Sequence, residues 1–89
     1  MKTLINKLRV IDLTRYVAGP HSTMILAELG ADVIKIEKID GGDELRTIGP
    51  KINDISLWSA VLNRSKRSLS LDIRKTEGRE IFFKLIKEA

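Results

Sequence analysis

Two short apolar runs flank one amphipathic stretch in residues 8–38, and this arrangement constrains the fold more than any other feature of the chain. Residues 8–13 and 32–37 are rich in β-branched side chains, which is typical of strands. Between them, Gly19-Pro20 marks a turn, residues 20–30 repeat apolar side chains at helical spacing, and Gly30 stands where helices commonly end. Strand, helix and strand in so short a span predict a βαβ unit with parallel strands and a right-handed crossover.

The remainder of the chain continues the alternation. Residues 38–54 contain Gly-Gly and Gly-Pro pairs without periodicity, which predicts a long loop of functional importance. We then expect a helix over 55–63, a strand over 68–73, and a last helix over 76–88 with Thr76 as its N-cap. The predicted fold class is α/β, a Rossmann-like parallel sheet of βαβ units. Because three parallel strands leave exposed edges, we interpret residues 1–89 as the N-terminal part of a larger fold or half of a two-chain assembly.

The turn after the first strand resembles the place where α/β proteins bind nucleotides. A dinucleotide site would carry three glycines as G-x-G-x-x-G, whereas residues 14–20 offer only Gly19, followed by a proline that lacks a backbone donor. Glu37 does stand where the ribose-binding acid of such sites is expected. Without the glycines, an NAD or FAD site is not favoured, and a purely structural turn stays open.

The chain carries a net charge of +4, and its basic residues crowd the second half. Lys38 and Arg74 follow predicted strands, so they belong to the carboxyl edge where α/β sheets bind ligands, and their charges suit a phosphate. The cations Arg64, Lys66 and Arg67 precede a strand, and a solvated basic face fits them better. Nucleic acid is not the expected partner, because aromatic residues make up 4% of the chain and no nucleic-acid motif is present.

Other function classes find little support in the sequence. The absence of cysteine excludes disulfides and thiolate metal sites and fits the cytoplasm, and no apolar run approaches the roughly 20 residues of a membrane helix. His21 is the only histidine and has no acidic partner nearby in sequence, so we do not expect a catalytic base. We therefore expect no catalytic residue and no metal site in these 89 residues, and a cytoplasmic protein.

Three segments together resemble one enzyme family. They are LRVIDLTRYVAGPHSTMILAELGADVIKIEK, GGDELRTIGP and LNRSKRSLSLDIRKTEGREIFFKLI, in this order along the chain. They resemble the start of class III CoA-transferases, which include formyl-CoA and carnitine CoA-transferases and the related α-methylacyl-CoA racemases. The resemblance covers residues 8–88.

The resemblance implies that the predicted edge of the sheet binds coenzyme A. In the family, the main chain of the first turn lies near CoA, which here corresponds to Val17 and Ala18; many transferases carry glutamine at the position of Val17. An arginine of the family that faces the nucleotide corresponds to Lys38, which keeps the charge but not the bidentate fork. Contacts on the adenosine side correspond to Leu71, Asp72, Ile73 and Arg74.

The resemblance also implies the activity. It favours the N-terminal part of a CoA-transferase that moves CoA from an acyl-CoA to a carboxylic acid through an aspartyl intermediate, with no metal. The family's catalytic aspartate lies beyond the length of this chain, so we expect residues 1–89 alone to be inactive. The family forms interlinked dimers, which implies a homodimer or a complementing chain as partner. An α-methylacyl-CoA racemase and a non-catalytic remnant are the alternatives.

Overall fold

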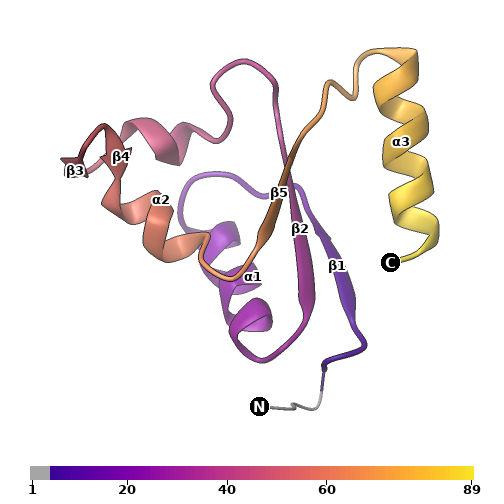
Figure 1. The fold of residues 1–89 in the computed structure, drawn as a ribbon, viewed down its shortest axis with the longest axis horizontal. Helices are drawn as coiled ribbons and strands as arrows, with labels where there is room; N and C mark the ends of the chain where they lie inside the picture. Colours follow the sequence, from indigo (N-terminus) through magenta and orange to yellow (C-terminus); the bar gives the residue numbers. More distant parts are fainter. Residues whose placement is uncertain (1–4) are drawn as a thin grey trace.

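The chain folds around a small parallel sheet, as the computed structural model shows for residues 5–89, the part that the structure describes (Figure 1). The sheet contains β1 (Arg9–Asp12), β2 (Asp32–Glu37) and β5 (Arg67–Ser70) in the order β1-β2-β5. Both pairings are parallel, with Val10 opposite Val33 and Ile36 opposite Leu69. The predicted parallel three-strand α/β architecture is therefore confirmed.

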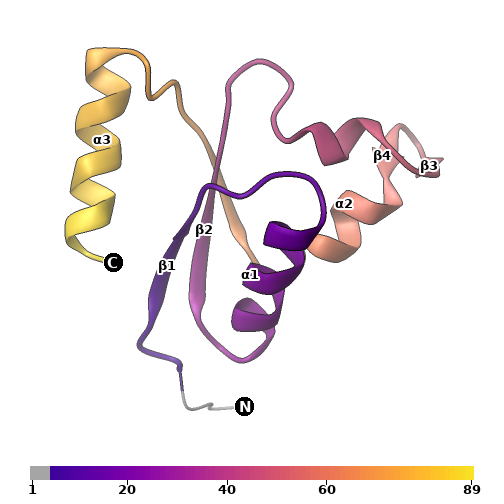
Figure 2. The same cartoon turned by 180° about the vertical axis from the view of Figure 1, so that it is seen from behind.

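Helix α1 (Ala18–Glu28) connects β1 to β2 and covers one face of the sheet (Figure 2). It begins two residues before the predicted start, so Pro20 lies in its first turn, where backbone N–H groups have no helical acceptor and a proline is tolerated. As predicted, the helix ends just before Gly30. Gly30 has a φ of +108°, and the bonds Gly30 N–Ala27 O and Ala31 N–Leu26 O close a Schellman motif.

The segment between β2 and β5 contains more secondary structure than the loop and single helix predicted for it. It contains a 3₁₀ turn, η1 (Glu44–Thr47), and a small antiparallel hairpin of β3 (Lys51–Ile52) and β4 (Ile55–Ser56). The predicted loop over 38–54 is wrong at these elements. Asn53 and Asp54 form the hairpin turn with φ values of +51° and +63°, which is the two-residue turn that suits a twisted hairpin.

The last three predicted elements have different bounds in the structure. Helix α2 (Leu57–Leu62) begins after Ser56, whose Oγ accepts a hydrogen bond from Ser59 N and caps the helix. The strand predicted over 68–73 ends at Ser70. Its neighbour β2 ends at Glu37, whose carbonyl accepts a last hydrogen bond from Leu71 N, so the residues after Leu71 have no strand to pair with. Helix α3 (Thr76–Lys87) begins with Thr76 rather than being capped by it, since the Lys75 carbonyl accepts the first helical bond.

The core lies between α1 and the sheet. Ala27, Ala31 and Val33 form its buried centre, with Val10 and Leu26 packed against them. In contrast, α3 stands apart on the β1 side of the sheet (Figures 1 and 2), and an exposed ion pair of 3.2 Å joins Arg9 to Glu88 at its end. Within residues 5–89, no helix has the length and apolar character needed to cross a membrane.

Candidate functional site

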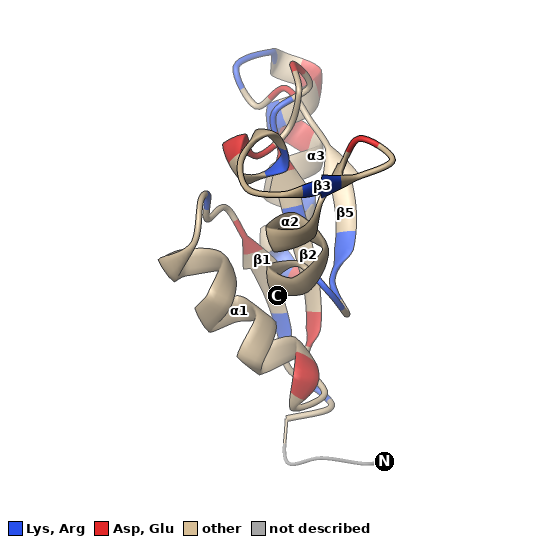
Figure 3. Ribbon diagram, turned by 90° about the vertical axis from the view of Figure 1, so that its left-hand side faces the viewer, with Lys and Arg blue, Asp and Glu red and all other residues tan. Residues whose placement is uncertain are grey.

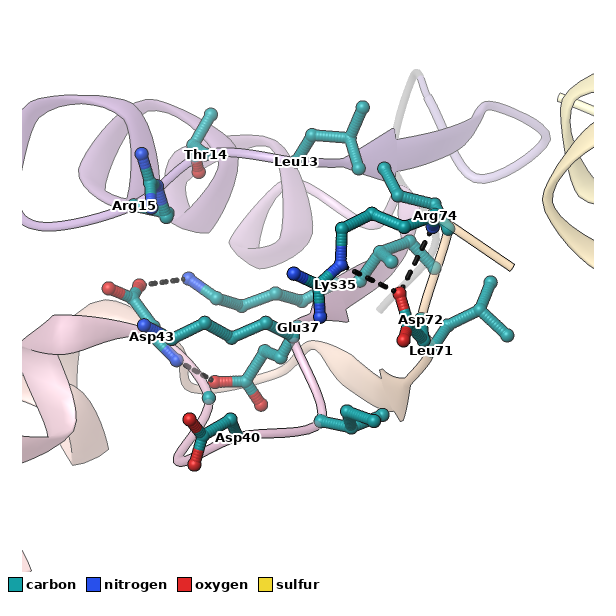
Figure 4. A pocket seen from close by; sticks show the side chains of 15 residues that line it. Leu13, Thr14, Arg15, Lys35, Glu37, Asp40, Asp43, Leu71, Asp72 and Arg74 are labelled. Carbon is teal, nitrogen blue, oxygen red and sulfur yellow. Dashed lines mark hydrogen bonds and ion pairs between the residues drawn. The ribbon is translucent and has the colours of Figure 1, made fainter. Parts of the chain in front are cut away.

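A cavity of about 590 Å³ opens at the carboxyl ends of all three parallel strands. Figure 4 shows side chains from three separate segments converging on it. One segment follows β1, one comprises the end of β2 and the loop after it, and one follows β5. The lining residues are Leu13, Thr14, Arg15, Lys35, Ile36, Glu37, Lys38, Ile39, Asp40, Gly42, Asp43, Leu71, Asp72, Ile73 and Arg74.

The exposed cations of the cavity are held by carboxylates of the same chain. Lys38 Nζ and Arg15 Nη1 lie 3.0 and 3.1 Å from the same oxygen, Glu44 Oε1. Arg74 Nε lies 3.1 Å from Asp72 Oδ1, and the Arg74 side chain is 84% exposed. Hydrogen bonds from the Arg74 side chain and backbone lower the pKa of Asp72. The cavity thus carries exposed cations that pair with two carboxylates, Glu44 and Asp72, and a bound anion could replace these carboxylates.

The structure brings together most of the residues predicted to bind a ligand. Lys38, Leu71, Asp72, Ile73 and Arg74 all line the cavity. The remaining two, Val17 and Ala18, lie at the start of α1, outside the cavity lining. Lys38 directly follows β2, and Arg74 lies in the turn after the adjacent strand β5, so both belong to the carboxyl edge on which the sequence placed them.

Glu37 lines the cavity, and both of its carboxylate oxygens accept hydrogen bonds from neighbouring donors. Its Oε1 accepts from Arg46 Nε at 2.8 Å and Asp43 N at 2.9 Å, and its Oε2 accepts from Arg46 Nη2 at 2.7 Å and Ser68 Oγ at 2.9 Å. The bonds from Arg46, opposed by burial and supported by the Asp43 backbone and Ser68, lower the pKa of Glu37 to about 2. A carboxylate so occupied does not suit the ribose-binding role of a dinucleotide site.

One buried ion pair lines the cavity, and a second buried pair is joined to it. Lys35 Nζ is 2.6 Å from Asp43 Oδ2, and Lys66 Nζ is 3.0 Å from Asp12 Oδ2; all four side chains are at most 2% exposed. Asn63 Oδ1 accepts from both lysines, at 3.0 and 2.9 Å, and so joins the pairs. We define these five residues as the lysine network.

The lysine network shows that the prediction for Lys66 was wrong, and the contacts among its other members were not predicted from the sequence. Lys66 is buried and does not belong to a solvated basic face, because Asp12 and Asn63 lie within its reach. Burial lowers the pKa of Lys66, and the bond to Asp12 opposes this shift. A signal for the network was present in the sequence: Lys35 interrupts the apolar run of the central strand, where both faces are buried and a cation needs a partner.

Acidic and basic residues are mixed around this end of the molecule. Blue and red segments alternate along the loops beyond the strands, and they do not form a face of one sign (Figure 3). This pattern does not match the uniform basic surface of a nucleic-acid-binding domain. Among residues 5–89, no group of three or more metal-ligating side chains comes together.

Residues 5–89 match the family model described as CoA-transferase family III. The chain belongs to this family. The resemblance of the three sequence segments to class III CoA-transferases is therefore confirmed.

Three CoA-transferases align with nearly the whole chain. It is 43% identical over 90 residues to succinyl-CoA:mesaconate CoA-transferase of Haloarcula hispanica, covering 96% of this chain and 22% of that protein. It is 44% identical over 82 residues to acetyl-CoA:oxalate CoA-transferase of Acetobacter aceti, covering 92% and 21%. It is 43% identical over 90 residues to formyl-CoA:oxalate CoA-transferase of Escherichia coli, covering 100% and 22%.

Two solved structures contain a segment with the same fold. A CaiB/BaiF family protein from Brucella suis superposes with a TM-score of 0.90 at 39% identity, covering 100% of this chain and 25% of that protein. A hypothetical protein from Mycobacterium tuberculosis gives 0.85 at 32% identity, covering 98% and 24%. The chain thus spans about a quarter or less of the length of these relatives, and corresponds to one segment of the family fold.

Proposed function

We propose that this chain is the N-terminal, CoA-binding segment of a CoA-transferase that moves CoA from an acyl-CoA to a carboxylic acid. The observation that carries the proposal is the cavity at the carboxyl ends of three parallel strands, with Arg15, Lys38 and Arg74 at its rim. In α/β sheets this edge is the usual place for a ligand. The three relatives reported above, which are CoA-transferases of different acyl specificity, favour a transferase over a racemase.

The cavity has the two surfaces that the nucleotide end of CoA needs. The aliphatic side chains of Leu13, Ile39, Leu71 and Ile73 line it, and they offer apolar surface to an adenine ring. Lys38 and Arg74 suit the phosphates, the first as a point charge and the second as a planar fork. We propose that Val17 and Ala18 contribute main-chain contacts farther along the same ligand.

The acyl-transfer chemistry belongs to the rest of the family fold in this proposal. The aspartyl intermediate, the identity of the acid substrate, and a homodimer or complementing chain as partner stay predictions, as does a cytoplasmic location. Residues 1–89 would contribute binding and orientation of CoA. The buried acids Asp12, Glu37 and Asp43 are all engaged with donors of the chain itself, so none of them is offered as the nucleophile.

Calorimetric titration of the chain with CoA tests the proposal. We expect Lys38→Ala and Arg74→Ala each to weaken binding about three- to tenfold, because each removes a charge-assisted contact that is partly screened by solvent. Lys51→Ala is the matched control, since Lys51 is an exposed lysine of the β3–β4 hairpin outside the cavity. Equal affinity of all three variants and the parent chain would contradict the assignment of the cavity.

A further inference from the structure

The turn between β1 and α1 contains a residue in an unfavourable backbone conformation. Tyr16 has a φ of +67°, the left-handed region that costs free energy in residues other than glycine. Such a conformation persists only when surrounding contacts fix it. One contact is visible at the residue itself: Tyr16 N donates a hydrogen bond of 3.0 Å to Asp43 Oδ1.

Asp43 is held in place from several directions. Its side chain is 1% exposed, and its Oδ2 lies 2.6 Å from Lys35 Nζ. Its Oδ1 also accepts from Leu45 N at 3.0 Å, and its own backbone N–H donates to Glu37 Oε1 at 2.9 Å. Its two carboxylate oxygens therefore have different partners: Oδ2 pairs with Lys35, and Oδ1 accepts from the backbone N–H groups of Tyr16 and Leu45.

The same network reaches the two ends of the turn. Asp12, at the end of β1, accepts a bond of 2.8 Å from Thr14 N. Lys66 lies against Asp12 and also donates to the Pro20 carbonyl at 3.0 Å, in the first turn of α1. With Tyr16 held by Asp43, the turn is fixed at its start, middle and end, and Val17 and Ala18 have little freedom between these points.

We propose that Asp43 is a positioning residue for coenzyme A: by holding Tyr16 in the left-handed conformation, it sets the main chain at Val17 and Ala18. This inference rests on the function proposed above. Asp43 acts through the turn, although it also lines the cavity. Its role differs from that of a structural ion pair, because the acceptor of the Tyr16 N–H is Oδ1 and the ion pair to Lys35 uses Oδ2.

A pair of substitutions separates positioning from stability. Asp43→Ala removes the acceptor, and Tyr16→Gly supplies a residue that adopts positive φ without strain. Two quantities are measured on the 89-residue chain: CoA affinity by calorimetry, and the intraresidue amide–α-proton NOE of residue 16, which is strong in the left-handed conformation. We expect Asp43→Ala to lose this NOE and to weaken CoA binding about tenfold, as for one lost hydrogen bond.

The double variant Asp43→Ala, Tyr16→Gly should recover most of the affinity lost in Asp43→Ala, because glycine needs no help to adopt the conformation. Asp43→Asn gives a second arm if the alanine variant does not fold. Its amide oxygen still accepts from Tyr16 N and Leu45 N, so the NOE and the affinity should stay within about threefold of the parent while thermal stability falls. Asp54→Asn, the same change at the exposed hairpin turn, is the control.

Three results would contradict one or the other of the two proposals. A folded Asp43→Ala chain with an unchanged NOE and unchanged affinity overturns the inference. So does a loss of affinity that Tyr16→Gly fails to recover, since that result marks Asp43 as structural only. A parent chain that does not bind CoA overturns the proposed function instead, and in that case the NOE of the variants still decides whether Asp43 holds the turn.

Discussion

Three carboxylate side chains are buried within the part of the chain that the structure describes. Asp12, Glu37 and Asp43 would each be costly to bury as unpaired charges, and each is surrounded by cations, hydroxyls or backbone N–H groups. Burial raises the pKa of Asp12 and of Asp43, but the hydrogen bonds outweigh burial and the net pKa of both is lowered. All three therefore stabilise the fold as charged groups.

Glu37 makes the stability of the chain depend on acid pH. Its pKa is about 2 in the folded chain and near 4.5 when unfolded, so the unfolded state binds the proton first as the pH falls. Its contribution is complete above about pH 4.5 and declines toward pH 2, by up to about 3 kcal/mol. Urea unfolding at a series of pH values should show this loss. Glu37→Gln should be less stable at neutral pH and show a flatter profile over the same range.

Two cations of the basic run 64–67 should contribute differently to stability, because Lys66 is buried and Arg64 is half-exposed. Lys66→Ala leaves Asp12 buried without its cation and should cost about 3 kcal/mol of unfolding free energy. Arg64→Ala removes a half-exposed pair with Glu28 and should cost less than about 1 kcal/mol. Urea denaturation of both variants measures the difference. Equal losses would mean that the burial of Lys66 is not as described.

At the scale of elements, sequence patterns predicted the central βαβ unit well. Strand β2 has the predicted bounds, and Gly30 ends α1 as expected, because a β-branched run and a left-handed glycine are local signals. The β3–β4 hairpin was not predicted, although Asn53-Asp54 between isoleucines is a turn signal, because two-residue strands are too short to show alternation. The position of the cavity at the carboxyl ends of the strands could be predicted from the parallel topology. The pairing of Lys35 with Asp43 could not, because it depends on how the loop after β2 folds back on that strand.

Gly78 shows how one residue fixes the position of α3. An added Cβ would lie 1.9 Å from the Asp72 carbonyl oxygen, in the turn that carries Arg74. Gly78→Ala should therefore destabilise the chain by about 2 kcal/mol, although alanine normally favours a helix over glycine. Thermal unfolding measures this, with Glu80→Ala, exposed on the same helix, as control. Increased stability of Gly78→Ala would contradict the close approach.

At the scale of the whole molecule, the chain has a cavity at the carboxyl edge of its sheet and incompletely covered helices. Ile81, Phe83 and Ile86 of α3 remain exposed, as do Trp58 and Val61 of α2. The relatives are four to five times longer, and in them this segment is one part of a larger fold. In the function that we propose, CoA binds at this edge of the sheet and the remainder of the family fold supplies the chemistry.

The most direct test of the central claim is a titration of isotopically labelled chain with CoA, followed by backbone amide NMR. We predict that shift changes gather at three segments far apart in sequence, residues 13–18, 38–43 and 71–74, which border the cavity and the first turn of α1. The hairpin residues 51–56 should not shift. Shifts confined to one of the three segments, or centred on the hairpin or α3, would contradict the assignment of this edge to coenzyme A.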